Sequence, residues 1–215
     1  MKKIAIFGAG GFGREVACLI NKINEENTQS NQWQLIGFFD DVQPIGYKNE
    51  YGEVLGGLKD LNKWDEELSI AIAIGNSLVV RKIVEKITNP NILFPNLSYN
   101  LYTADPNNIK IGKGNIMTRG CSLSCNVSIG NFNVFNSQVV LGHDVVIGNF
   151  NTIMPGVRIS GNVEIKNNNF LGVGSIVLQK LKIGEFVKLG AGSVLMTNPK
   201  DKNLYIGNPA KIFRY

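Results

Sequence analysis

The stretch IGNFNVFNSQVVLGHDVVIGNF, residues 129 to 150, decides the fold because it belongs to a sequence that repeats at a fixed interval. Large apolar residues recur at every sixth position, without insertion or deletion, fifteen times. They are Ile111, Met117, Leu123, Ile129, Phe135, Leu141, Ile147, Ile153, Ile159, Ile165, Leu171, Val177, Ile183, Leu189 and Leu195. Neither the 3.6-residue period of a helix nor the 2-residue period of a flat strand produces this spacing.

A slower period of 18 residues lies on top of the first. The turn sequences IGKGN, IGNFN, IGNFN, IKNNN and IGEFV begin at residues 111, 129, 147, 165 and 183. Three hexapeptides therefore form one coil with three short strands, joined at corners by turns that Gly or Asn eases. The pattern predicts a triangular parallel β-helix of five coils, about 4.8 Å apart, in which the large residues point inward.

The residues before the repeats predict a strand, a glycine loop and a helix. KIAIF (3–7) is a short apolar strand, GAGGFG (8–13) matches G-x-G-x-x-G, and FGREVACLINKI (12–23) carries its apolar residues on one helical face. Glycines let the backbone approach a diphosphate, and a helix N-terminus presents free N–H groups to it. We therefore expect Gly10, Gly11, Phe12 and Gly13 to bind substrate.

Two further strands and a helix complete the first half. LIGFFDD (35–41) predicts a strand ending in Asp40 and Asp41, whose carboxylates suit a ribose or base, while LSIAIAIG (68–75) and SLVVRKIVEKI (77–87) predict a strand and a helix. Only about 95 residues precede the repeats, which leaves room for one mononucleotide-binding half and not the two of a full dinucleotide fold. We favour a nucleotide-sugar-binding domain over an NAD domain or a structural domain without ligand.

Composition narrows the class of protein. No apolar run reaches the roughly 18 residues of a membrane span. The apolar run in MKKIAIFGAG at the N-terminus is too short for the apolar core of a signal peptide. We therefore expect a cytoplasmic protein without membrane insertion. Three cysteines and one histidine form no convincing zinc site, so we expect no metal and reduced cysteines.

The charge is uneven along the chain. Residues 1–100 hold 10 Lys/Arg and 12 Asp/Glu, a net charge of −2, whereas residues 101–215 hold 12 and 5, a net charge of +7. The lysines of the second half are scattered, without a basic run or interleaved aromatic residues, so we expect no nucleic-acid partner. A small molecule that bears phosphate fits better, although a solvated face is the alternative.

With these features the chain resembles the left-handed β-helix acyltransferases of the hexapeptide-repeat class. Within that class it resembles the sugar acetyltransferases that have an N-terminal nucleotide-binding domain. The resemblance spans almost the full length, through GAGGFGREV (8–16), FFDD (38–41), IAIGN (72–76) with Arg81, FNSQVVLGHDVVIGNF (135–150), GVRISGNVEIKNNNFLGVGSIV (156–177) and YIGNPAK (205–211). It implies a Rossmann-like half domain (1–95), a left-handed parallel β-helix (96–200) and a C-terminal tail (201–215). It also implies a homotrimer with acetyl-CoA between neighbouring helices.

His143, the only histidine, follows the inward Leu141 by two residues and precedes Asp144, so both are expected at a corner. Acetyl transfer needs a base near neutrality, which histidine supplies. The resemblance implies that His143 is the general base and that the adjacent acid orients its ring. The relatives carry Glu where this chain has Asp144, which reaches about 1.5 Å less far.

The remaining site residues come from the resemblance. It implies that Asn136 lies near the acceptor and that the N–H of Gly161 faces the thioester carbonyl. Substrate contacts are also implied for Gly75, Asn76 and Arg81, and cofactor contacts for Thr152, Gly172, Ala191 and Lys211, with Arg214 as an alternative to Lys211. Phe12 and Thr152 stand where some relatives of the UDP-amino-sugar type carry histidine, which leaves the acceptor open.

The function expected from the sequence is acetyl-CoA-dependent acetylation of an amino group on a nucleotide-linked sugar, of the UDP-amino-sugar N-acetyltransferase type, for surface glycan biosynthesis. Two alternatives are a sugar O-acetyltransferase of the sialic acid type and a non-catalytic scaffold that binds nucleotide sugars. An NAD-dependent oxidoreductase is the weakest alternative.

Overall fold

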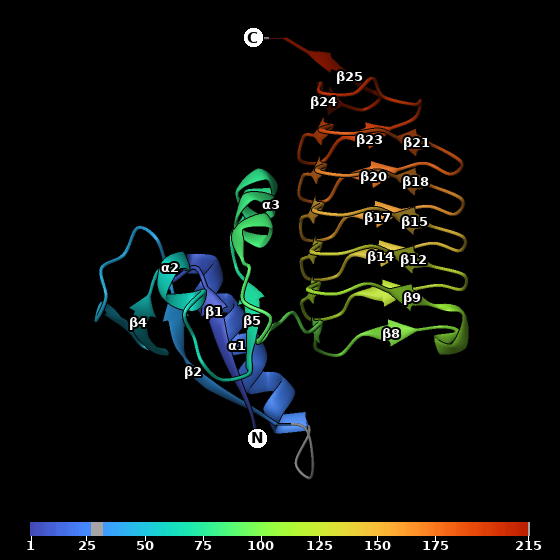
Figure 1. The fold of residues 1–215 in the computed structure, drawn as a ribbon. Coiled ribbons are helices and arrows are strands. Elements are labelled where there is room, and N and C mark those ends of the chain that lie inside the picture. The colour runs from blue at the N-terminus through green and yellow to red at the C-terminus, as the bar shows by residue number, and fades with distance from the viewer. Residues whose placement is uncertain (27–31, 215) are drawn as a thin grey trace. The chain divides into compact units, whose positions relative to one another are not determined.

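A computed structural model describes residues 1–26 and 32–214, and the chain divides into two compact units, Met1–Leu97 (unit 1) and Ser98–Tyr215 (unit 2) (Figure 1). Unit 1 mixes helices and strands, whereas unit 2 is a stack of short strands. Within the described ranges, no helix is both long enough and apolar enough to cross a membrane.

Unit 1 is built on one six-stranded sheet in the order β3-β4-β2-β1-β5-β6. Its elements are β1 (Lys2–Phe7), α1 (Gly11–Glu26), β2 (Trp33–Phe39), β3 (Lys48–Asn49), β4 (Gly52–Gly56), α2 (Leu58–Leu61), β5 (Leu68–Ile72), α3 (Ser77–Lys86) and β6 (Ile92–Leu93). Strand β1 is central and runs parallel to β2 and β5, whereas β3 and β4 form an antiparallel pair. The strands and helices expected from the sequence are present, but the β3–β4 pair, α2 and β6 were not anticipated.

In the glycine loop of unit 1, the start of α1 packs closely against the backbone at the end of β1. A Cβ atom at Gly13, in the first turn of α1, would lie 1.9 Å from the carbonyl oxygen of Gly8. Gly8 itself has φ +112°, and a side chain there would meet the carbonyl oxygen of Ala73 at 2.7 Å. These two glycines therefore allow α1 to begin directly at the end of β1.

Unit 2 is a parallel β-helix with three faces, and each coil contributes one strand to each face (Figure 1). Face 1 contains β7 (Leu97–Ser98), β10 (Ile116–Met117), β13 (Val134–Phe135), β16 (Thr152–Ile153), β19 (Phe170–Leu171), β22 (Lys188–Leu189), β24 (Leu204–Gly207) and β25 (Ala210–Phe213). Face 2 contains β8 (Tyr102–Thr103), β11 (Ser122–Leu123), β14 (Val140–Leu141), β17 (Arg158–Ile159), β20 (Ile176–Val177) and β23 (Val194–Leu195). Face 3 contains β9 (Lys110–Ile111), β12 (Ser128–Ile129), β15 (Val146–Ile147), β18 (Glu164–Ile165) and β21 (Lys182–Ile183).

The stacking follows the sequence repeat. Strands of successive coils pair in parallel at a separation of 18 residues, as Val134 does with Thr152 and Leu141 with Ile159. The second residue of each hexapeptide strand is buried from Met117 to Leu195, which confirms the inward column. The β-helix also begins earlier than the repeats indicate, because β7 and β8 precede Ile111 and the 3-10 helix η1 (Pro106–Asn108) interrupts that first coil.

Corners are named by the faces they join, so that corner 2–3 lies between faces 2 and 3. The expectation that Gly or Asn eases every corner is incomplete. Phe132, Phe150 and Phe186 also have positive φ values, as do Gln138, Asp144 and Lys180, all between 55° and 63°. At corner 3–1 the rings of Phe132 and Phe150 stack with centroids 5.5 Å apart, so contact between coils offsets the strain of this conformation.

A buried ladder of asparagines, Asn115, Asn133, Asn151 and Asn169, runs inside corner 3–1. Asn151 illustrates its bonding: Nδ2 donates to Asn133 Oδ1 at 3.0 Å and to the carbonyl of Lys166 at 2.9 Å. Its Oδ1 accepts from the backbone N–H and the Nδ2 of Asn169. Each coil is thereby tied to its neighbours by side-chain as well as backbone hydrogen bonds.

Candidate active site

His143 and Asp144 lie at corner 2–3, between β14 and β15, where the sequence placed them. The imidazole is 56% exposed, and its Nδ1 lies 2.7 Å from Asp144 Oδ2. A carboxylate only accepts hydrogen bonds, so the neutral ring donates its proton from Nδ1 and carries its lone pair on Nε2. Nε2 makes no hydrogen bond with any residue in the described ranges, so it is available to accept a proton.

The carboxylate of Asp144 has a second partner that the sequence analysis missed. Asn126 Nδ2, one coil below, donates to Asp144 Oδ1 at 3.1 Å. The hydrogen bond from His143 and the one from Asn126 both favour the charged form, so they hold the pKa of Asp144 below its ordinary value. The 18-residue spacing between positions 126 and 144 is the signal that was missed, because it places the two residues in adjacent coils.

Gly161 lies one coil above His143 and directly beside its ring. A Cβ atom at Gly161 would be 2.5 Å from His143 Nε2, so only glycine leaves room for this ring position. The backbone N–H of Gly161 makes no hydrogen bond to the described part of the chain. A side chain at Gly142 would lie 2.6 Å from that nitrogen, so glycine at 142 keeps the N–H open. A free base and a free N–H donor are therefore neighbours.

The other expected residues of unit 2 lie elsewhere. Asn136, Gly172 and Ala191 gather at corner 1–2, where a Cβ atom at Gly172 would lie 2.6 Å from the backbone nitrogen of Ala191. Thr152 is buried on face 1, and Lys211 is exposed on β25, in the hairpin that ends the β-helix. Within one chain, face 2 thus separates Asn136, Gly172 and Ala191 from His143.

Unit 1 contains a pocket of about 590 Å³ at the carboxyl ends of β1, β2 and β5. Gly10, Gly11 and Phe12 line it at the start of α1, and Asp40 and Asp41 line it after β2. No atom lies within 4 Å of where a Cβ would stand at Gly10 or Gly11, so both face open space. The glycine loop and the two carboxylates, which lie far apart in the sequence, are brought to one cavity as expected.

The carboxylates are already engaged with the backbone. Asp40 accepts from the N–H groups of Ala9, Val42 and Gln43 at 2.8 to 3.0 Å. Burial alone would raise the pKa of Asp40, but these three donors outweigh it and hold the pKa below its ordinary value. Asp41 Oδ1 accepts from the N–H of Leu58 at 2.8 Å, which leaves its other oxygen for a ligand.

Four expected substrate residues do not line this pocket: Gly13, Gly75, Asn76 and Arg81. Asn76 Oδ1 accepts from the N–H of Leu78 at 3.0 Å and caps the start of α3. Arg81 Nε donates to Glu85 at 2.8 Å, one turn along that helix. Substrate contacts at these positions remain predictions that the pocket does not support.

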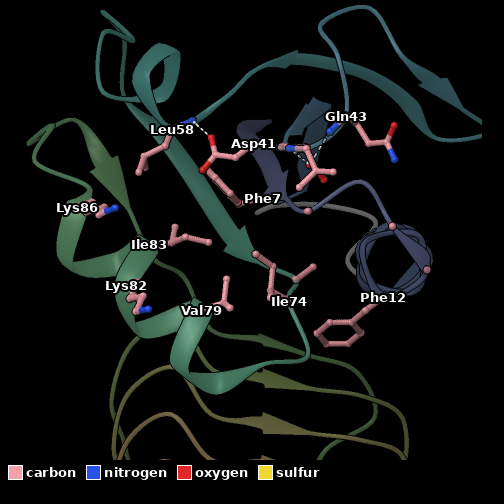
Figure 2. Close-up of a pocket in the computed structure, with 16 residues that line it drawn as sticks. Phe7, Phe12, Asp41, Gln43, Leu58, Ile74, Val79, Lys82, Ile83 and Lys86 are labelled. Carbon is pink, nitrogen blue, oxygen red and sulfur yellow. Dashed lines mark hydrogen bonds between the residues drawn. The ribbon is translucent and has the colours of Figure 1, made fainter.

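The pocket side of α3 carries Val79, Lys82, Ile83 and Lys86 instead, facing Phe12 and Ile74 across the cavity (Figure 2). The spacing of these four residues is that of one helical face, and this spacing was the missed signal. Two ammonium groups on one wall and the N-terminus of α1 on another suit a ligand that carries phosphate.

Comparisons with known proteins agree with both units. Residues 3–87 match the family model of the PglD N-terminal domain. The acetyltransferase domain of PglB from Neisseria gonorrhoeae, solved with acetyl coenzyme A, superposes with a TM-score of 0.87 at 28% identity, covering 99% of each chain. WeeI from Acinetobacter baumannii gives 0.85 at 27% identity, covering 99% of this chain and 100% of that one.

Over nearly its whole length the chain is therefore similar to sugar acetyltransferases of the hexapeptide-repeat class. A variant of perosamine N-acetyltransferase from Caulobacter crescentus, solved with CoA and GDP-perosamine, shares the fold with a TM-score of 0.86 at 22% identity, covering 100% of this chain and 98% of that one. A search of curated proteins gave no match.

The expected fold class is confirmed: a Rossmann-like α/β half domain followed by a left-handed parallel β-helix. Among the residues that the structure describes, no three His, Cys, Asp or Glu side chains come together as metal ligands. The cysteines Cys18, Cys121 and Cys125 are all free thiols.

Proposed function

We propose that the protein transfers the acetyl group of acetyl-CoA to the amino group of a nucleotide-linked sugar, with His143 as general base. One observation carries the proposal: Nδ1 of the only histidine is held by Asp144 at 2.7 Å while Nε2 stays free beside the open N–H of Gly161. The likeness to an acetyltransferase domain solved with acetyl coenzyme A supports the donor.

The chemistry follows from these atoms. The amine nitrogen attacks the thioester carbonyl carbon, a C–N bond forms, and Nε2 of His143 takes the proton that the amine loses. The N–H of Gly161 stabilises the carbonyl oxygen as it gains negative charge. The C–S bond then breaks, and the imidazolium returns its proton to the leaving sulfur, so that CoA departs as the free thiol.

A homotrimer is part of the proposal because a single chain leaves the site divided between two corners. Face 2, which separates them, exposes apolar side chains in its upper coils: Ile176 on β20, Val173 at corner 1–2, and Leu178 and Met196 at corner 2–3. Three-fold packing of triangular prisms would cover such a face and bring corner 1–2 of one copy to corner 2–3 of the next. Acetyl-CoA would lie between the two copies.

The pocket of unit 1 is proposed to hold the nucleotide part of the acceptor. Its glycine loop, the N-terminus of α1 and the two lysines suit a diphosphate, and Asp41 Oδ2 suits a donor on the ribose or base. We further propose that the enzyme acts in the cytoplasm, in the biosynthesis of a surface glycan. An unlinked sugar or a hydroxyl acceptor, as in a sialic acid O-acetyltransferase, would not need these phosphate-binding features.

Thiol release tests the proposal. The protein is incubated with acetyl-CoA and a panel of nucleotide-linked amino sugars, the free amino sugars and sialic acid, and CoA thiol is followed with a chromogenic disulfide. We expect release only with a nucleotide-linked amine, and its loss in His143→Ala at unchanged melting temperature. Release with sialic acid alone would favour the O-acetyltransferase, and nucleotide binding without release would favour the scaffold.

A further inference from the structure

Three successive coils place an asparagine or aspartate at the same position of corner 2–3. Asn126, Asp144 and Asn162 are 18 residues apart, and all three adopt the left-handed conformation, with φ of 56°, 57° and 59°. Asn and Asp tolerate this region better than other residues with a side chain. Their side chains consequently leave the corner in register, one above the other.

The contacts of these residues are not equivalent. Asn126 Nδ2 donates to Asp144 Oδ1 at 3.1 Å, while Asp144 Oδ2 accepts from His143 Nδ1 at 2.7 Å, so the carboxylate is held at both oxygens. Asn162 Nδ2 lies 3.5 Å from Nδ1, but an amide donor facing a nitrogen that already donates gains little from that contact.

We propose that Asn126 is a positioning residue for the acetyl-transfer reaction: it fixes the carboxylate of Asp144 so that His143 keeps its proton on Nδ1 and its lone pair on Nε2. The inference rests on the proposed function. It also gives a physical reason why a short aspartate suffices here, because the coil below supplies the second anchor.

The mechanism is a restraint on one torsion. Without a donor at Oδ1, the exposed carboxylate rotates about its terminal torsion, where the barrier is broad and low. The Nδ1–H···Oδ2 bond then loosens, and rings that carry the proton on Nε2 become more populated. One hydrogen bond of ordinary net strength corresponds to a roughly three- to tenfold change in that population.

The other ionisable groups near corner 2–3 do not contact the side chains of His143 and Asp144 through hydrogen bonds. Cys125 lies in the coil below, and its carbonyl accepts from the N–H of Asp144 at 3.0 Å. Lys180 lies in the coil above Gly161, and the ion pair Glu164–Lys182 lies on face 3 at 2.9 Å. None of these groups makes a hydrogen bond to His143 or to the carboxylate of Asp144, so removing the side chain of Asn126 isolates its effect.

The test uses Asn126→Gly, which removes the amide and keeps a residue that accepts positive φ. Asn100→Gly is the matched control, because Asn100 is exposed and has φ 50° at corner 1–2 of the first coil. Since the chain has one histidine, the imidazole nitrogen signals of ¹⁵N-labelled protein report on His143 alone. The tautomer population is measured in wild type and both variants, together with kcat and KM for acetyl-CoA.

In Asn126→Gly we expect a roughly three- to tenfold rise in the ratio of the Nε2–H form to the Nδ1–H form, a fall in kcat that matches the lost fraction of the Nδ1–H form, and an unchanged KM for acetyl-CoA. Asn100→Gly should match wild type. Imidazole signals of Asn126→Gly that superimpose on those of wild type would overturn the inference. A wild-type protein that transfers no acetyl group would overturn the proposed function instead, and the imidazole signals would still decide the role of Asn126.

Discussion

Replacing Gly161 with alanine tests whether His143 acts from the position seen in the structure. The new methyl carbon would lie 2.5 Å from Nε2 and 2.6 Å from Cε1 of the ring, against 3.4 to 4 Å for ordinary contact, so the ring has to move by about 1 Å. Gly161 has no positive φ, so alanine fits the backbone. A displacement of about 1 Å from the reacting atoms lowers the rate about a hundredfold.

Stability should respond differently from activity. The ring of His143 is 56% exposed and swings toward solvent, so we expect the free energy of unfolding of Gly161→Ala to change by less than about 1 kcal/mol. Gly130→Ala is the matched control, because its Cβ would meet the carbonyl oxygen of Gly148 at 2.6 Å, and backbone cannot swing away. We expect it to lose about 1–3 kcal/mol of stability while the folded enzyme keeps its kcat.

The assay is CoA thiol release at saturating substrates, with thermal melting and the imidazole spectrum of the single histidine measured on the same samples. Compared with wild type, Gly161→Ala should have a nearly unchanged melting temperature, a shifted imidazole signal and a lower kcat. Full activity in Gly161→Ala would refute the position of the base. Equal loss of kcat per folded molecule in both variants would show that any disturbance of the β-helix impairs catalysis, and would refute the argument from the ring contact.

Asp144→Asn should lower kcat and move the acid limb of kcat/KM to lower pH, because the charged ring loses its carboxylate partner, whereas profiles that superimpose after scaling would count against the pair. Asn151→Ala should lose roughly 3–5 kcal/mol of unfolding free energy in denaturant melts, since it leaves the buried N–H of Asn169 and the carbonyl of Lys166 without partners; a loss below about 1 kcal/mol would contradict the ladder. Burial raises the pKa of Cys121 to about 11, so alkylation at pH 8 should spare it in the native protein and reach it after unfolding, as peptide mass mapping would record. The pKa of Asp40 is lower in the folded protein than in the unfolded chain, so its stabilising contribution is complete above the unfolded value of about 3.8 and disappears as pH falls through the folded pKa. Wild type should therefore lose more stability on acidification than Asp40→Ala. Parallel curves of stability against pH would argue against this role of Asp40.

The sequence alone determined the β-helix and the corner that carries the base. A six-residue period locks each large residue into an inward column, and an 18-residue period stacks equivalent positions of successive coils, so the fold of residues 111–195 follows from spacing. The same spacing predicted that His143 and Asp144 lie at one corner. In unit 1, the glycine loop and the pair Asp40 and Asp41 were placed correctly at one pocket, because parallel strands end at the same edge of a sheet.

Only the tertiary structure decided which groups face each other. A motif cannot reveal the rotation of a helix against its sheet, so Arg81 was favoured where Lys82 and Lys86 line the pocket. Contacts along a corner depend on side-chain direction, so the partner of Asp144 in the coil below and the contact of Gly161 with the ring of His143 emerged only in three dimensions. Residue spacing records which positions repeat, but the direction of each side chain is settled by packing between coils and layers, which is not local in the sequence.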